Sequence, residues 1–299
     1  MTDLLARYRE GSFSVRRDDL AAAVVTGPDR VRWLNGMVST DVAKVGEGRG
    51  LLSLAVGRTG KIMAEFVMIA RGETLVLLMP KGIRDAVVTH FARHLIMDDA
   101  EISPLDALRV VQVVGSTAGQ TMDTLRSERT GDAHALVATG AGDDGFFLVD
   151  SNAPSVLELS DDAPEVEAVR VARGLPRFGV DYNETHYPQE ALLEKTHVAF
   201  DKGCYLGQEV VCMLELRGHV KRKLALVTVG STAPAGTPVA SLEGVPVGEL
   251  HGAAPHACEA GKTLAFVMVK VAFAELGREL RVGDQLALVV APPLAAVTP

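Results

Sequence analysis

Short apolar runs bounded by turn residues fill the first third of the chain. Runs of this length and composition predict strands, and they occur at four places: 20–27, 51–56, 61–70 and 74–79. The run Gly57-Arg58-Thr59-Gly60 separates the second from the third and indicates a hairpin. Residues 28–36 have an early proline and a closing glycine, which predict a helix. Residues 81–97 have apolar residues four apart, which also predict a helix. This third therefore mixes strands and helices.

The middle third continues the mixture and then loses its periodicity. Strands are predicted over 108–115 and 145–150, and helices over 118–126 and 163–172. The acidic, polar residues 160–165 are expected to supply the N-cap of the second helix. From 174 to 208 the chain is rich in glycine, proline, tyrosine and histidine. Long loops inside a compact chain are usually functional.

The last third has the pattern of a small all-β domain, either a sandwich or a barrel. Its expected strands are 224–229, 244–250, 264–269 and 285–290, punctuated by glycine and proline. The fold class is therefore α+β followed by an all-β domain. The expected domains are an α+β part over 1–105, a second α+β part over 106–220 and a β-domain over 221–299.

Composition narrows the class of protein. The chain has 299 residues, of which 47% are hydrophobic and 23% charged, which is typical of a soluble globular protein and excludes a disordered one. The net charge of −8 argues against non-specific nucleic-acid binding, which needs clustered cations. Three cysteines are too few for a disulfide framework and favour a reducing compartment. We expect a cytoplasmic protein without a membrane anchor, since no apolar run is long enough to span a bilayer. We also expect a monomer, because nothing in the sequence demands a dimer.

Two motifs suggest cofactor or metal chemistry and are better explained without it. The run 140–145 matches G-x-G-x-x-G, but a strand follows it where a dinucleotide site needs a helix, so we interpret it as a hairpin turn. His90 and His94 have the spacing of two metal ligands on a helix. An otherwise amphipathic surface helix favours a solvated face there, and we predict no metal site.

The stretch Arg217-Gly218-His219-Val220-Lys221-Arg222-Lys223 gathers four cations in an acidic protein. It is either a solvated loop at a domain junction or a site for an anionic ligand such as a carboxylate tail.

The run Lys202-Gly203-Cys204-Tyr205-Leu206-Gly207-Gln208-Glu209 contains the most chemistry. Glycines allow close approach of a ligand, and a nearby cation or a helix N-terminus at Gly207-Gln208 makes a thiol more reactive. Composition alone still favours a buried, structural Cys204. Cys212 lies in an apolar run and is expected in the core. Without a C-x-x-C motif, a complete iron–sulfur or zinc site within the chain is not expected.

These residues resemble the signature of the YgfZ-type folate-binding proteins, relatives of the glycine cleavage T-protein, an aminomethyltransferase. The similarity covers most of residues 20–225. Further matching segments are 25–30, the run Trp33-Leu34-Asn35-Gly36-Met37-Val38-Ser39-Thr40-Asp41-Val42, Gly60-Lys61-Ile62, 169–181, Pro188-Gln189-Glu190, 217–219 and 223–224.

The resemblance implies a three-domain ring around tetrahydrofolate, with two interleaved α+β domains and a C-terminal β-barrel. It assigns Glu190 to the pterin ring, which a carboxylate can bind in bidentate fashion. It also implies that Arg222 faces the folate carboxylates and that Asn35, Met37 and Thr40 lie near the cavity.

One departure from the transferase pattern bears on the chemistry. Where the transferases have two consecutive carboxylates, this chain has Ala64-Glu65. Glu65 is a poor substitute for an acid/base group that must lie within hydrogen-bond reach of the reacting nitrogen. YgfZ-type members are implicated in keeping iron–sulfur enzymes active, including enzymes that modify tRNA. We therefore favour a folate-dependent protein of that kind, with Cys204 as a functional thiol and iron–sulfur enzymes or assembly proteins as clients. The alternatives are an aminomethyltransferase and a regulatory folate-binding module with a structural cysteine.

Overall fold

The computed structural model describes residues 2–106, 108–128, 133–150, 159–160, 163–218 and 220–294. The chain forms two compact units. One, here the sheet unit, comprises Thr2–Asp161 and Lys195–Val210; the other, here the barrel unit, comprises Asp162–Glu194 and Val211–Pro299. Each unit is therefore assembled from two separate stretches of sequence. The expected domain boundaries at 105 and 220 stay a prediction.

The sheet unit contains a five-stranded antiparallel sheet in the order β4-β5-β6-β2-β7. Its strands are β2 (Leu20–Thr26), β4 (Leu51–Val56), β5 (Ile62–Arg71), β6 (Thr74–Pro80) and β7 (Glu101–Leu105). The predicted hairpin at 57–60 joins β4 to β5, and β2, β4, β5 and β6 fall on the predicted runs. The sequence pattern did not predict β7.

A second sheet of six strands completes the unit, in the order β11-β1-β8-β10-β9-β3. Its strands are β1 (Phe13–Arg16), β3 (Gly48–Arg49), β8 (Leu108–Val114), β9 (His134–Ala138), β10 (Asp143–Asp150) and β11 (Leu159–Ser160). Strands β9 and β10 pair antiparallel on either side of residues 139–142. The G-x-G-x-x-G run therefore forms a hairpin, as predicted.

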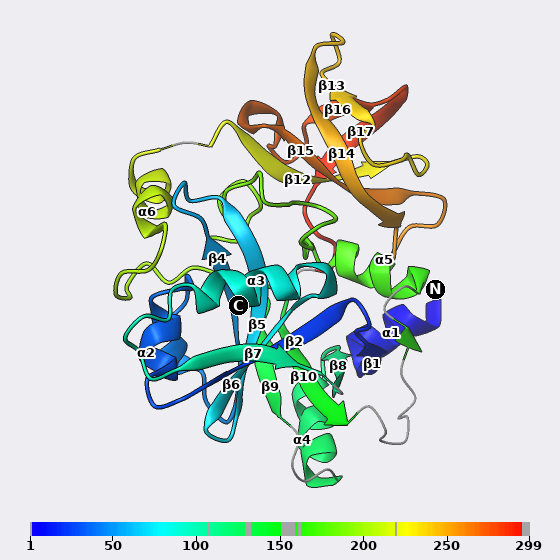
Figure 1. Ribbon diagram of the computed structural model, residues 1–299. Coiled ribbons are helices and arrows are strands. Elements are labelled where there is room, and N and C mark those ends of the chain that lie inside the picture. Colours follow the sequence, from blue (N-terminus) through cyan, green and yellow to red (C-terminus); the bar gives the residue numbers. More distant parts are fainter. Residues whose placement is uncertain are drawn as a thin grey trace. The chain divides into compact units, whose positions relative to one another are not determined.

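Alternation along the strands explains how the sheets stack. On β5, Phe66 and Met68 join a core beneath the helices, whereas Val67 and Ile69 join a core shared with the six-stranded sheet. Because successive side chains point to opposite faces, a strand buried on both faces is apolar throughout. The helices α2 (Arg30–Asn35) and α3 (Arg84–Ala92) cover one outer face and α4 (Ala118–Glu128) the other, as Figure 1 shows. The remaining short elements of this unit are α1 (Thr2–Glu10), η1 (Val42–Lys44) and η2 (Lys81–Ile83).

Helix α3 is shorter than the predicted 81–97. It ends at Ala92 because the chain then turns back toward the start of α2. There the Asp98 carboxylate pairs with Arg32 at 2.8 Å, and the Asp99 N–H donates to the Asp29 carboxylate at 2.9 Å. These contacts hold residues 98–99 in a conformation that a continued helix could not reach.

The barrel unit is a closed barrel of six strands in the order β12-β15-β14-β13-β16-β17 (Figure 1). They are β12 (Arg222–Val229), β13 (Pro238–Ala240), β14 (Pro246–Pro255), β15 (Thr263–Lys270), β16 (Glu279–Val282) and β17 (Gln285–Val290), with η3 (Val271–Phe273) after β15. The predicted β-domain is thus a barrel, and the α+β class with a C-terminal barrel is confirmed.

Helix α5 (Pro164–Ala172) packs against β14 and β15 of this barrel. Its predicted side-chain N-cap is wrong. Ala163 occupies the cap without a side-chain hydrogen bond, and Pro164 begins the helix instead. Proline suits that position because its missing N–H would have no partner in the helix. Apart from one isolated bridge, the long stretch from Arg173 to Gly207 has neither helix nor strand, as its composition predicts. Helix α6 (Gln208–Leu216) follows it.

Candidate functional site

A loop of the sheet unit carries the cysteine motif, and Lys202 fastens it. We call residues 195–207 the cysteine loop. The Lys202 ammonium donates to the carbonyl oxygens of Asn35, Val38 and Thr40 at 2.7, 2.7 and 2.8 Å. It also lies 5.1 Å from the ring centroid of Tyr205. A lysine presents exactly three N–H donors, so this side chain is fully used.

Backbone hydrogen bonds fasten the cysteine loop on both sides of Cys204. The Ala199 N–H donates to the Ser39 carbonyl at 2.9 Å, and the Leu206 N–H donates to the Gly36 carbonyl at 3.0 Å. The Ser39 hydroxyl in turn donates to the His197 carbonyl. The loop therefore runs along residues 35–40, which follow helix α2.

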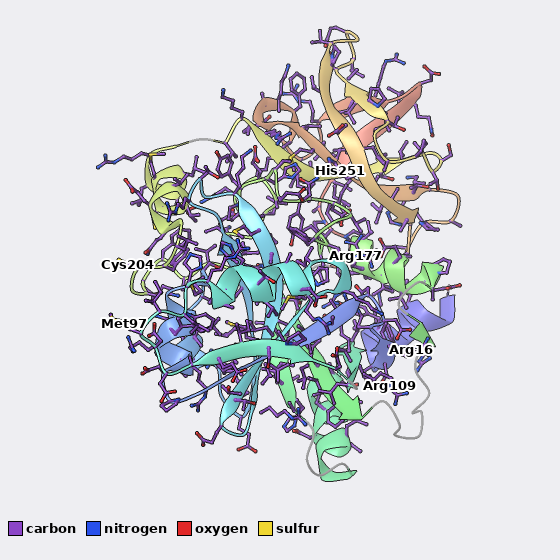
Figure 2. All side chains as sticks on the ribbon, viewed as in Figure 1. Arg16, Met97, Arg109, Arg177, Cys204 and His251 are labelled. Atoms are coloured by element: carbon purple, nitrogen blue, oxygen red, sulfur yellow. The ribbon has the colours of Figure 1, made fainter. Side chains whose placement is uncertain are left out.

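Cys204 is exposed, at the outer edge of this fastened loop (Figure 2). The expectation of a buried structural cysteine is wrong. The buried side chain at this point of the loop is that of the next residue, Tyr205. Because Lys202 points its ammonium at carbonyl oxygens, its first role is to hold the loop and not to face the thiol.

Gly207 and Gln208 set the start of helix α6. Gly207 has φ +80°, and a Cβ placed there would lie 2.3 Å from the Gly57 carbonyl oxygen, so only glycine fits. Gln208 then accepts the Tyr205 N–H with its side chain. Glu209 is exposed in the first turn, where a carboxylate suits the helix dipole. Gly203, in contrast, has open space around its Cα.

Cys212 is not in a core, contrary to expectation. It is half-buried on α6, where Val211 is buried and Met213 is exposed. The apolar run 210–214 is helical, so its residues point in different directions and only part of the run can be buried.

Of the residues predicted near the cavity, Asn35, Met37 and Thr40 lie beside the cysteine loop. Asn35 accepts the Val42 N–H with its side-chain oxygen at 3.0 Å, and Met37 is part of the core beneath α2. Thr40 is buried, and its hydroxyl has no hydrogen-bond partner among the described residues.

Glu65 lies on β5 and pairs with a histidine that the sequence did not single out. The Glu65 carboxylate is 3.1 Å from Nε2 of His197, and Nδ1 of His197 is 2.7 Å from the Thr196 hydroxyl. His197 is buried. The neighbouring Ala64 is fully buried and apolar. No sequence spacing links residues 65 and 197, so only the fold reveals this pair.

Glu190 and Arg222 come together within the barrel unit. Arg222 Nε donates to Oε1 of Glu190 at 3.1 Å, and the Tyr187 N–H donates to Oε2 at 3.0 Å. Glu190 is only 5% exposed. The Leu224 N–H donates to the Glu190 carbonyl, which joins this turn to strand β12. The side chain of Glu190 is therefore held by two donors, one from its own turn and one from the start of strand β12.

The turn that carries Glu190 ends on an unusual backbone conformation. The N–H groups of Glu190 and Ala191 donate to the Tyr187 carbonyl, which makes a single helical turn. Leu192 then has φ +65°, the one positive φ outside glycine among the described residues. A bulky residue in the left-handed region is uncommon and costs energy, so the surrounding contacts hold this turn in place.

The remaining predicted clusters give no metal site in the described part of the chain. His90 and His94 lie with ring centroids 4.9 Å apart, but His94 is beyond the end of α3, and its Nδ1 is 3.0 Å from the His90 carbonyl oxygen. Both are half-buried, on a segment that also carries the exposed residues Thr89 and Arg93. In the basic stretch, Arg222 contacts Glu190 and His219 lies outside the described residues.

Comparison with solved structures identifies the class of fold. The chain superposes on aminomethyltransferase T of the glycine cleavage system from Bartonella henselae with a TM-score of 0.82, covering 98% of this chain and 89% of that one at 15% identity. It therefore has the fold of the glycine cleavage T-protein.

Sequence comparison then gives the particular relatives, which are YgfZ proteins. The chain is 25% identical over 228 residues to the tRNA-modifying protein YgfZ of Escherichia coli strain SMS-3-5, covering 71% of this chain and 70% of that protein. It is 26% identical over 236 residues to the same protein of Cronobacter sakazakii, covering 73% and 71%. No model of a protein family matches. The resemblance drawn from the motifs is confirmed. No helix within the described ranges is long and apolar enough to cross a membrane.

Proposed function

We propose that this protein binds a tetrahydrofolate and supports the iron–sulfur enzymes that modify tRNA, with Cys204 as its functional thiol. One observation carries the proposal: Cys204 is exposed in the middle of a loop whose backbone is hydrogen-bonded on both sides. A structural cysteine would be packed, whereas an exposed thiol on an ordered loop suits contact with another molecule. That relatives are named tRNA-modifying proteins supports the same function.

The folate part of the proposal rests on Glu190. A carboxylate can accept several hydrogen bonds, and each Glu190 oxygen has one protein donor. The remaining lone pairs suit the 2-amino group and ring N–H of a pterin, and the fixed, mostly buried side chain would not need to reorganise. The residues present therefore fit a folate. The proposed places of Asn35, Met37, Thr40, Glu65 and Arg222 beside the folate rest on motif position.

Aminomethyl transfer is the less favoured function. Ala64 has no carboxylate, and Glu65 is engaged with His197. A transferase would require purified protein to move a one-carbon unit from an aminomethyl donor to tetrahydrofolate, and Glu65→Gln would abolish that activity. We propose that no turnover occurs. None of the three cysteines forms a disulfide, which also supports a reducing, cytoplasmic setting. The net charge of −8 supports action through client proteins and not through nucleic acid itself.

Complementation tests the role of the thiol. In a strain that lacks its own YgfZ, Cys204→Ser should fail to restore iron–sulfur enzyme activity, whereas Cys258→Ser, which alters another exposed cysteine, should restore it. Both variants should melt within about 2–4 °C of the wild type, the shift expected for roughly 1 kcal/mol in a chain of this size. Full restoration by Cys204→Ser would contradict the proposal. Strong destabilisation by Cys204→Ser would instead support a structural cysteine.

A further inference from the structure

His186 is a buried histidine of the barrel unit that has an unused hydrogen-bonding atom. The residue is 3% exposed, and its Nε2 has no hydrogen-bond partner among the described residues. A buried polar group without a partner costs stability, and native proteins keep few of them. The nearby ring of His251 on β14, labelled in Figure 2, lies edge-on at 6.0 Å between centroids and gives Nε2 no acceptor.

The contacts of the other ring nitrogen decide what Nε2 can do. The Asn183 N–H donates to Nδ1 of His186 at 3.2 Å. The Asn183 side-chain oxygen is 3.0 Å from Nδ1, but it already accepts from the N–H and the hydroxyl of Thr185. Nδ1 is therefore the acceptor. Burial lowers the pKa of His186, with a further contribution from the positive charge of Arg222, so the ring is neutral and its single proton is on Nε2. His186 thus presents one buried donor.

His186 and Glu190 belong to the same turn of the barrel unit. Oε2 of Glu190 accepts a hydrogen bond from the backbone N–H of Tyr187. Tyr187 is the residue that follows His186, so this N–H belongs to the peptide bond between the two. Both Glu190 and Arg222 are near enough for their charges to act on the pKa of His186. One buried donor and one buried two-oxygen acceptor therefore stand four residues apart in the same turn, and each has hydrogen-bonding capacity left for a ligand.

We infer that His186 and Glu190 together recognise the 2-amino-4-oxo edge of a pterin. Along that edge a carbonyl acceptor is followed by a ring N–H and an amino group, both donors. Glu190 accepts from the two donors, and His186 Nε2–H donates to the carbonyl oxygen. His186 is thus a specificity-determining residue that selects the 4-oxo ring. This inference rests on the proposed folate function. Guanine has the same hydrogen-bonding edge, so these two residues could bind either a pterin or a guanine. The experiment must therefore distinguish the two ligands.

Two substitutions of His186 separate the contribution of its Nε2 from that of its Nδ1. His186→Asn keeps an oxygen where Nδ1 accepts the Asn183 N–H but has no donor at the position of Nε2. His186→Gln can place an amide N–H near that position. The control is His256→Asn, because His256 is also buried in the barrel unit but its Nδ1 already accepts two N–H groups, those of Cys258 and Glu259. Thermal unfolding establishes that each variant is folded.

The probes are 5-formyltetrahydrofolate, its 4-amino counterpart and guanosine, titrated calorimetrically. We expect His186→Asn to lower the affinity for 5-formyltetrahydrofolate by about 5- to 30-fold, the effect of one lost buried hydrogen bond, and to leave the affinity for the 4-amino compound unchanged within about twofold. His186→Gln should recover part of the loss, and His256→Asn should match the wild type.

Three results would overturn the inference, and they differ from one another. Wild-type affinity for 5-formyltetrahydrofolate in His186→Asn would remove His186 and leave folate binding intact. Equal losses for the 4-oxo and 4-amino compounds would assign His186 a structural role only. Tighter binding of guanosine than of the reduced folate would assign the site to guanine. Failure of the wild type to bind any folate would instead contradict the proposed function itself.

Discussion

Lys202 joins segments that are far apart in sequence. The three carbonyl oxygens that accept its N–H groups lie 162, 164 and 167 positions earlier in the chain. Lys202→Met would leave all three without this donor. We expect the free energy of unfolding to fall by on the order of 2–4 kcal/mol, since hydrogen bonds to charged groups are the stronger ones. Denaturant unfolding measures this. Lys195→Met, at an exposed lysine of the same loop, should change stability little, and an equally small effect of Lys202→Met would remove the fastening role.

The same lysine makes stability depend on pH. Burial lowers the pKa of Lys202 from 10.5 to about 8, while the charge of Asp41 opposes this shift. The folded protein therefore binds fewer protons than the unfolded chain between these two values, so this group adds stability as pH rises through that window. The difference in unfolding free energy between wild type and Lys202→Met should widen from about pH 7 to about pH 9.5. A constant difference would show that Lys202 does not titrate in that range.

At the residue scale, the sequence predicted the identity of the candidate site residues more accurately than their positions in the fold. The motif singled out Cys204 and Glu190, and similarity supplied the reason for both. Composition wrongly placed Cys204 in the interior, because its exposure depends on bonds to residues 36–40 that no local pattern contains. His197 and His186 were missed for the same reason: a lone histidine acquires its partners only through the fold.

At the scale of elements, the junction between the cysteine loop and helix α6 depends on one glycine. Gly207→Ala would put a Cβ against the Gly57 carbonyl oxygen at a left-handed φ. We expect a loss of at least about 2 kcal/mol, from the backbone strain and the clash together. Gly203→Ala is the matched control, since nothing lies within 4 Å of its added Cβ. Equal stability of the two variants, measured by chemical denaturation, would contradict this account of the junction.

The sequence predicted long strands well and short or capped elements poorly. Strands β4, β5 and β6 are apolar runs between clear turn residues, so their limits lie within about one residue of those expected. Strands β13 and β16 have three and four residues, too few for a period to show. Helix α3 ended early because contacts with the start of helix α2 hold residues 98–99. Helix α5 is capped by the geometry of a proline in place of a polar side chain. Such outcomes depend on tertiary contacts that local propensity does not contain.

At the scale of the whole molecule, the proposed function divides between the units. The thiol loop belongs to the sheet unit, and the fixed Glu190 carboxylate belongs to the barrel unit, each assembled from two stretches of the chain. A ligand that binds only the folded state stabilises it, by about 2.7 kcal/mol at a concentration 100 times its Kd. A reduced folate should therefore raise the melting temperature of the wild type by roughly 5–10 °C at that excess. The absence of a shift, at a concentration where calorimetry detects binding, would contradict binding to the native state.

The most direct test of the central claim is anaerobic calorimetric titration of tetrahydrofolate into the wild type, Glu190→Gln and Glu184→Gln. Glu184 is an exposed carboxylate in the same segment and serves as the control. We predict binding to the wild type and to Glu184→Gln with equal affinity. Glu190→Gln should weaken binding by on the order of 1–3 kcal/mol, since it replaces a charged acceptor with an amide that cannot accept from both pterin donors. Wild-type affinity in Glu190→Gln, or no binding to the wild type, would contradict the claim that Glu190 holds a folate.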